Sequence, residues 1–172
     1  MIDPFANLES LIRSVYAYVA YRVGDGPDAE DVTSETFERA FRYRSSFDAR
    51  KGEPIAWLVG IARHCIDDER AARRPEPSDE LEEHATGDVE GETVLRLELR
   101  TAVLKLSPRE RDLVALRYGA DLKVRQIAEL LGERTNTIEV ALHRALGRLR
   151  GLLDGETPPA QGLASRKNPV RI

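Results

Sequence analysis

Residues 75–92 divide the chain into two parts. This segment contains two prolines, two glycines, eight acidic residues and no lysine or arginine. It has too few apolar side chains to offset the entropy lost on ordering. On both sides of it, apolar residues recur at the spacing of one helix face. We therefore predict an all-α protein with two small helical domains, residues 1–74 and 93–155, joined by an acidic flexible linker.

Three helices are predicted before the linker, over about residues 7–23, 28–44 and 55–73. Gly24, Gly26 and Pro27 separate the first two, and Pro54 suits the first position of the third, where its missing N–H costs nothing. One apolar stripe per helix is enough to close a small bundle. The predicted core positions are Leu8, Leu11, Ile12, Val15, Val19, Val23, Ala29, Val32, Thr33, Thr36, Phe37, Ala40, Phe41, Trp57, Leu58, Ile61, Ala62 and Cys65.

Four helices are predicted after the linker. The first carries apolar residues through Leu106, and the next three cover about residues 108–119, 124–131 and 136–153. Ser107, Pro108 and Glu110 have the spacing of a capping box at the start of the second of these helices. Residues 156–172 lack periodicity, and we expect them to form a disordered tail.

The last two predicted helices have the pattern of a helix-turn-helix. Ala128 is small enough for two helices to approach closely, and Gly132 tolerates the positive φ that the turn needs. Ile138 follows where an apolar side chain would pack the second helix onto the first, and Thr135 is predicted to cap that helix. The second helix of such a motif enters the major groove of DNA.

The distribution of charge agrees with a DNA-binding C-terminal part. The net charge is −4, but residues 93–155 carry 12 basic and 8 acidic side chains. The acidic linker hides this basic balance in the whole-chain sum.

We expect the protein to be cytoplasmic. No apolar run is long enough to cross a bilayer, and the first residues lack the layout of a secretory signal. The single cysteine excludes an intramolecular disulfide and a Cys-rich zinc site. Nothing in the sequence predicts a metal site, a cofactor or a catalytic group.

Two blocks of sequence resemble the extracytoplasmic-function (ECF) group of bacterial sigma factors. DAEDVTSETFERAF (28–41), WLVGIAR (57–63) and the basic pair Arg73–Arg74 are similar to the family's region 2. SPRERDLVALRYG (107–119), QIAELLG (126–132) and TNTIEVALHRA (135–145) are similar to its region 4. The blocks follow the family order, and the resemblance covers about residues 6–155. It implies a promoter-reading subunit of RNA polymerase with no catalytic activity of its own.

The resemblance implies a role for three groups of residues. Core polymerase, through its β′ clamp helices, is expected to bind Glu30, Asp31, Ser34, Glu35 and Glu38. The −10 element is expected to contact Phe47, Asp48, Arg50, Lys51, Arg63, His64, Asp68 and Arg70. The −35 element is expected to contact Thr135, Asn136, Thr137, Glu139, Val140, His143, Arg144 and Arg148. Region 4 would also dock on the β-flap, and an anti-sigma protein is a further partner that the family suggests.

The chain departs from the family most in its last helix. Relatives commonly read GTVKSRLHRAR where this chain has NTIEVALHRAL (136–146). The usual lysine, serine and arginine are replaced by Glu139, Val140 and Ala141. A carboxylate at position 139 would repel phosphates but accept a hydrogen bond from cytosine N4.

Several alternatives stay open at this level. The acidic residues of 28–44 also suit a solvated face or the dipole of a helix start. The linker would either follow the RNA path of the polymerase or act as a plain tether. Trp57 would fill the core rather than stack on a base. For the whole chain, the rival hypotheses are a ligand-sensing helix-turn-helix regulator and a small enzyme using His64, Asp67 and Asp68.

Overall fold

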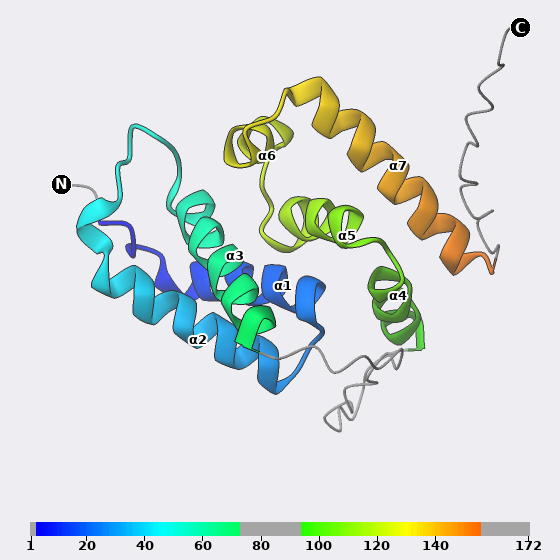
Figure 1. The fold of residues 1–172 in the computed structure, drawn as a ribbon, viewed down its shortest axis with the longest axis horizontal. Helices are drawn as coiled ribbons and strands as arrows, with labels where there is room; N and C mark the ends of the chain where they lie inside the picture. The colour runs from blue at the N-terminus through cyan, green and yellow to red at the C-terminus, as the bar shows by residue number, and fades with distance from the viewer. Residues whose placement is uncertain (1–2, 73–93, 156–172) are drawn as a thin grey trace, which may run out of the picture.

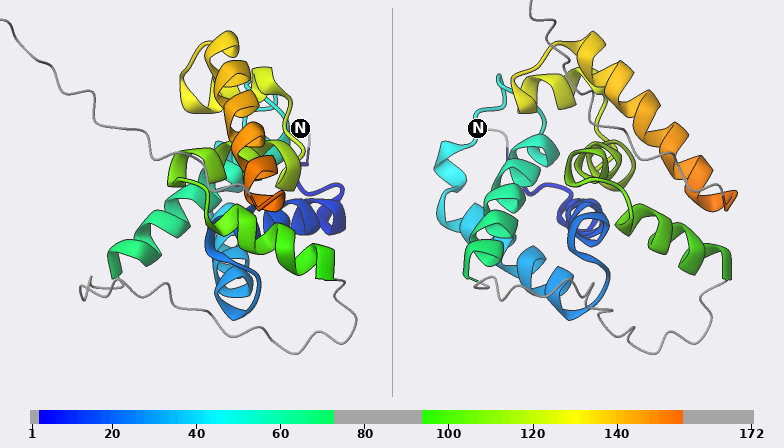
Figure 2. Two further views of the ribbon diagram at one scale, coloured as in Figure 1. Left: turned by 90° about the vertical axis from the view of Figure 1, so that its right-hand side faces the viewer. Right: turned by 45° about the vertical axis from the view of Figure 1, so that its right-hand side comes forward.

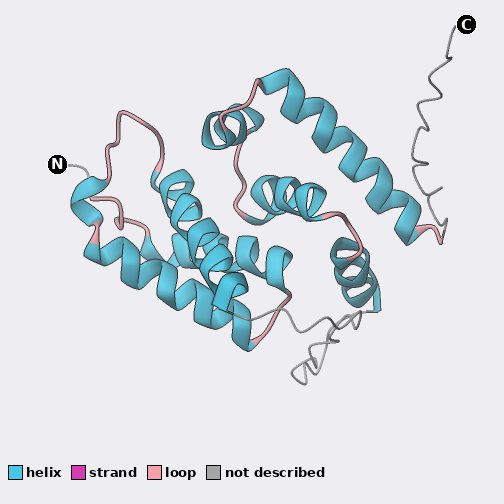
Figure 3. Ribbon diagram, viewed as in Figure 1, coloured by secondary structure: helices cyan, strands magenta, loops and turns pink. Residues whose placement is uncertain are grey.

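The computed structural model describes residues 3–72 and 94–155, and every regular element in these ranges is a helix (Figures 1 and 3). The first range contains α1 (Leu8–Val23), α2 (Pro27–Arg42), the 3₁₀ turn η1 (Arg44–Ser46) and α3 (Pro54–Ala72). The second contains α4 (Val94–Leu104), α5 (Pro108–Val114), the π-helical turn η2 (Ala115–Gly119), α6 (Val124–Leu131) and α7 (Thr135–Leu153). The predicted all-α class is confirmed. The predicted linker (75–92) and tail (156–172) lie entirely outside the described residues.

The three N-terminal helices pack as predicted, with two exceptions in the core. Ile12 is 42% exposed and Phe41 is 48% exposed, so placing them in the core was wrong. The angle of Ile12 on the helix does not explain its exposure, because Ile12 lies within about 20° of Val19, which is fully buried. Ile12 differs in lying two turns nearer the start of α1. Phe41 lies in the last turn of α2, and its ring faces Phe5 at 4.3 Å between centroids.

The helix ends agree with the predicted caps except at α7. Ser107 and Glu110 form the capping box at α5, and Gly132 takes a left-handed conformation with φ of 66° after α6. Thr135, however, is the first helical residue of α7. The capping position belongs to Arg134, which makes no side-chain cap bond, so the predicted Thr135 cap was wrong. Ile138 is fully buried and shares a core cluster with Ala128, as the motif requires.

The two groups of helices pack against each other. Figures 1 and 2 show α1 between its own bundle and the C-terminal helices, where it contacts α4, α5 and η2. One apolar cluster extends across both groups and includes Val15, Leu116, Ile127 and Leu142. At Gly119, an added Cβ would lie 2.8 Å from both the backbone N and the Cα of Tyr18. Only glycine allows η2 to approach α1 this closely.

Candidate nucleic-acid and protein interfaces

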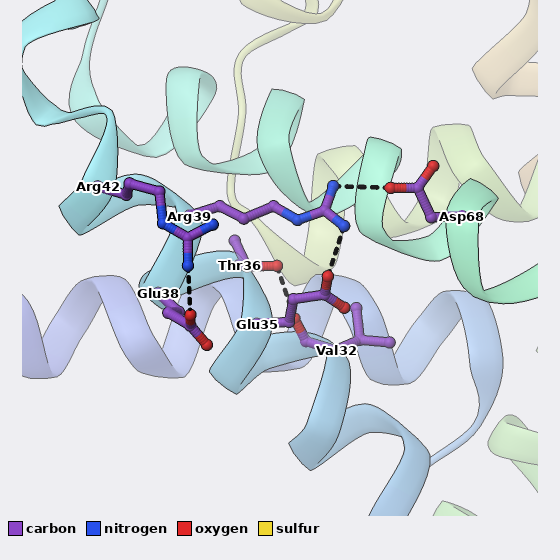
Figure 4. Close-up of polar contacts among 7 residues, drawn as sticks. All are labelled: Val32, Glu35, Thr36, Glu38, Arg39, Arg42 and Asp68. Carbon is purple, nitrogen blue, oxygen red and sulfur yellow. Dashed lines mark hydrogen bonds and ion pairs between the residues drawn. The ribbon is translucent and has the colours of Figure 1, made fainter.

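The acidic face of α2 is exposed but partly neutralised by arginines on the same helix. Glu30, Asp31, Ser34 and Glu38 are exposed, and Glu35 is half-buried. Figure 4 shows that Glu35 accepts a hydrogen bond from Arg39 and that Glu38 accepts one from Arg42 at 2.6 Å. Both pairs have the i, i+4 spacing at which helical side chains meet. Glu30 and Asp31 therefore leave the first turns of α2 more acidic than the turns that follow.

Arg39 also joins α2 to α3. Its guanidinium donates to Asp68 Oδ2 at 2.7 Å as well as to Glu35 (Figure 4). These two hydrogen bonds, with Asp68 contributing more, raise the pKa of Arg39 above its usual value. Arg39 and Glu35 also border an open depression of about 290 Å³. Its lining residues are Glu35, Glu38, Arg39, Arg42 and Tyr43.

The loop before α3 is held by a compact turn at Asp48. Arg50 donates to Asp48 through its backbone N–H at 3.0 Å and through its guanidinium at 3.0 and 2.9 Å. The side-chain hydrogen bond from Arg50 is the main reason that the pKa of Asp48 is lowered. Arg50 is thus oriented by Asp48, and Lys51 beside it is exposed. Ionised Asp48 keeps the loop in this shape.

Aromatic rings form the base of this loop. The ring centroids of Phe47 and Trp57 are 5.4 Å apart, and those of Trp57 and Phe5 are 6.3 Å apart. All three side chains are partly buried. Trp57 and Phe5 also pack against the main core cluster, which agrees with the structural role predicted for Trp57. Phe41 and Tyr43 extend the aromatic surface toward water, at 48% and 56% exposure.

The four predicted −10 residues of α3 do not share one face. Arg63 and Arg70 lie within about 20° of each other on the helix, while His64 and Asp68 lie about 100° and 140° away from Arg63. Asp68 pairs with Arg39 of α2. Arg63 is turned toward the C-terminal helices, with its Nη2 3.4 Å from Asp112 Oδ2. His64 and Arg70 are exposed.

Arg63 belongs to a polar cluster between the two helix groups, which we call the interface cluster (Tyr18, Arg22, Arg63 and Asp112). Arg22 of α1 and the Tyr18 hydroxyl both donate to Asp112 Oδ1, the hydroxyl at 3.0 Å. Arg22 also donates to the Tyr18 hydroxyl at 3.1 Å. Burial first, and then the charge of Asp112, raises the pKa of Tyr18. Tyr18, Arg22 and Asp112 are all buried.

The sequence prediction missed this cluster apart from Arg63. Tyr18 and Arg22 follow Val15 at the i+3 and i+7 positions, so they continue the apolar stripe of α1 with polar groups. A buried polar residue needs a partner. The positions of Tyr18 and Arg22 on this stripe could have predicted a buried polar contact, but they do not say which residue supplies the partner.

The helix-turn-helix presents one side of α7 to solvent. Its exposed residues in the first three turns define the recognition face (Thr135, Asn136, Thr137, Glu139, Val140, His143 and Arg144). The opposite side is buried through Ile138, Leu142, Ala145 and Leu149. Arg148 was predicted to join the recognition face, but it is half-buried and its Nη1 lies 3.9 Å from Glu110 Oε1 of α5.

Among the described residues, no group of three potential His, Cys, Asp or Glu ligands could hold a metal ion. Within the same ranges, no helix has the length and hydropathy to span a membrane.

Family models match both parts of the chain. The model described as Sigma-70 region 2 matches residues 8–76, and the model described as Sigma-70, region 4 matches residues 96–149. The second match includes the whole helix-turn-helix.

Individual relatives agree with these models. The ECF RNA polymerase sigma factor SigD of Mycobacterium tuberculosis is 32% identical over 163 residues, covering 83% of this chain and 73% of SigD. The ECF RNA polymerase sigma factor BldN of Streptomyces coelicolor is 35% identical over 160 residues, covering 88% of this chain. The aligned part is 61% of BldN, so this chain spans about three-fifths of that relative's length.

A solved structure has a similar fold. The sigma factor RpoE of Bartonella quintana, in complex with the anti-sigma factor NepR, matches with a TM-score of 0.72. The match covers 87% of this chain and 96% of that chain, at 22% sequence identity. At this identity the likeness concerns the fold.

Proposed function

The chain belongs to the ECF group of RNA polymerase sigma factors, and from this membership we propose that it binds core RNA polymerase and directs promoter-specific transcription initiation. The N-terminal helices would read and help to open the −10 element, and the C-terminal helices would read the −35 element. Polymerase would carry out all of the chemistry, and the protein would act in the cytoplasm as a subunit without catalytic activity.

The observation that carries the proposal is the recognition face of α7. Seven predicted −35 residues lie together on the exposed side of the second helix of a helix-turn-helix. In this motif that side enters the major groove, and its N-terminal residues reach base edges. His143 and Arg144 add donors that can bind phosphates or bases. A ligand-sensing helix-turn-helix regulator would carry the same surface, so it is the match to both sigma-70 regions that favours a sigma factor over that rival.

We assign core binding to the acidic face of α2. Glu30, Asp31, Ser34, Glu35 and Glu38 would meet the β′ clamp helices, as the family resemblance implies. Arginines neutralise two of these acids within the chain, so Glu30 and Asp31 would supply the strongest charge complementarity. Region 4 would meet the β-flap.

The −10 element would use the loop at Asp48 and the exposed part of α3. Lys51, His64 and Arg70 are exposed, and Phe47 and the Asp48–Arg50 turn lie in the loop that precedes α3. Arg63 and Asp68 would join them only by exchanging their present ion pairs for contacts with DNA.

This assignment divides the chain at the predicted boundaries. Residues 1–74 would act as region 2, 75–92 as the acidic linker, 93–155 as region 4 and 156–172 as a tail. We also propose that an anti-sigma protein regulates this chain, because the similar RpoE structure is a complex with one.

Core binding can be tested by reversing charge on α2. The Asp31→Lys/Glu35→Lys double variant should lose core polymerase in a pull-down, because like charges across an interface cost several kcal/mol. A matched control is Glu9→Lys/Asp154→Lys, which makes the same change of charge at exposed positions of α1 and beyond the end of α7. A circular dichroism spectrum should show that both variants are folded.

Two results would overturn the proposal. Full core binding by the folded α2 double variant would remove the assigned interface. Failure of the wild-type chain to bind core polymerase, together with specific binding to DNA on its own, would favour the helix-turn-helix regulator.

A further inference from the structure

One apolar side chain occupies the middle of the recognition face of α7. Val140 is 43% exposed, although its neighbours on that face are polar or charged. At about 100° per residue, Asn136 and Val140 lie within about 40° of each other and opposite the buried stripe of Ile138 and Leu142. Val140 therefore points away from the protein core, and its side chain is partly open to solvent.

The position of Val140 along α7 also matters. It is the sixth residue of the helix, in the second turn. The N-terminal residues of a recognition helix are those that reach base edges. Glu139 and Arg144 lie farther toward the sides of the face, at about 100° and 40° from Val140, nearer to where the phosphates would run.

The chemistry of the major groove offers one matching group. Base pairs present hydrogen-bond donors and acceptors there, and the only apolar group is the C5-methyl of thymine. A valine side chain can form no hydrogen bond, but its two methyl groups can cover that methyl and remove both surfaces from water.

We propose that Val140 is a specificity-determining residue that contacts the C5-methyl of one thymine in the −35 element. The inference rests on the proposed function, because it requires α7 to lie in the major groove of promoter DNA. It deepens that function by naming a base and the atom of it that is read.

The test uses holoenzyme reconstituted from core polymerase and the full chain. Duplexes with a randomised −35 region are first selected for binding. Each thymine of the selected sequence is then replaced in turn by deoxyuridine, which lacks only the methyl group. At one position the replacement should weaken wild-type binding about four-fold, the effect of withdrawing one methyl group from apolar contact.

Variants of α7 identify the residue responsible. Holoenzyme with Val140→Ala should bind the selected sequence more weakly and no longer distinguish thymine from deoxyuridine at that position. Leu153→Ala is the matched control, because Leu153 is equally apolar, 41% exposed and on the last turn of the same helix. It should leave the discrimination at about four-fold.

The outcomes separate this inference from the proposed function. If no sequence is enriched from the random pool, the proposed reading of a −35 element fails. If a sequence is enriched but no thymine responds to deoxyuridine, the assignment to Val140 is overturned. It is also overturned if Val140→Ala keeps the discrimination, or if that variant loses core polymerase instead.

Discussion

The two predicted DNA-binding surfaces differ in how far the rest of the chain occupies them. The recognition face of α7 consists of seven neighbouring side chains that are all exposed. The −10 residues come from a loop and a helix, and Asp48, Arg63 and Asp68 are each held in an ion pair. A surface carried by one helix can thus be ready for DNA, whereas one assembled from several elements is shaped by the contacts among them.

The largest effect is expected from the interface cluster, because it holds Arg63, one of the predicted −10 residues, in an ion pair. Asp112→Ala should lower the free energy of unfolding by about 3–5 kcal/mol, because it leaves Arg22 buried without its anion. Urea unfolding followed by circular dichroism would measure it. The same variant should release Arg63. The Arg22→Met/Asp112→Leu double variant is the control, since replacing both charges should restore most of the loss. A loss below about 1 kcal/mol for Asp112→Ala would show that the buried pair has little weight.

Gly119 tests the packing between the two groups of helices without altering any charge. Gly119→Ala places a Cβ 2.8 Å from backbone atoms of Tyr18 that cannot rotate away. We expect a loss of about 1–3 kcal/mol in stability and a larger radius of gyration in X-ray scattering as η2 moves off α1.

Gly147→Ala is the matched control for Gly119→Ala. Nothing lies within 4 Å of the position that its Cβ would occupy, so alanine inside α7 should stabilise the chain by about 0.5–1 kcal/mol. If both variants behaved alike, the close approach at Gly119 would not be what joins the two helix groups.

Glu139 tests whether the exposed recognition face of α7 reads bases. If it reads a base, Glu139→Lys should weaken binding to the cognate −35 sequence roughly ten-fold while raising affinity for scrambled DNA. Binding of the holoenzyme to cognate and scrambled duplexes over a salt series is the measurement. Uniform tightening on both duplexes, with a salt dependence steeper by about one phosphate contact, would instead show that the carboxylate only repels DNA.

The loop should give the smallest effect. Arg50→Ala/Lys51→Ala should slow promoter opening roughly three- to ten-fold, the loss of about one hydrogen bond, and change closed-complex formation less. Opening kinetics with a fluorescent promoter would separate the two steps. Asp48→Asn is the companion variant, because it weakens the pairing that orients Arg50 but keeps both basic side chains. Equal losses in both steps would mark Arg50 and Lys51 as simple phosphate contacts.

The sequence alone predicted the features that depend on local spacing. Helical periodicity located the seven α-helices of residues 3–72 and 94–155 to within a few residues. The capping box at Ser107 and the left-handed Gly132 followed from short-range chemistry. The recognition face was predictable for the same reason, since one helix with one buried side determines which residues point outward. The predicted cap at Thr135 was wrong by one residue, because the sequence pattern locates a helix end only to within one or two residues.

The tertiary structure decided which residues distant in sequence meet. Periodicity treated Ile12 and Phe41 as core, but both are exposed in the packed structure, because a helix face is covered only where another element lies against it. It gave no partner for Tyr18 or Arg22, because that partner, Asp112, lies about ninety residues away. Arg63 was predicted to face DNA, yet it lies against the same carboxylate. A pattern within one helix shows which side is buried, but only the packing of all the helices determines which residues that side contacts.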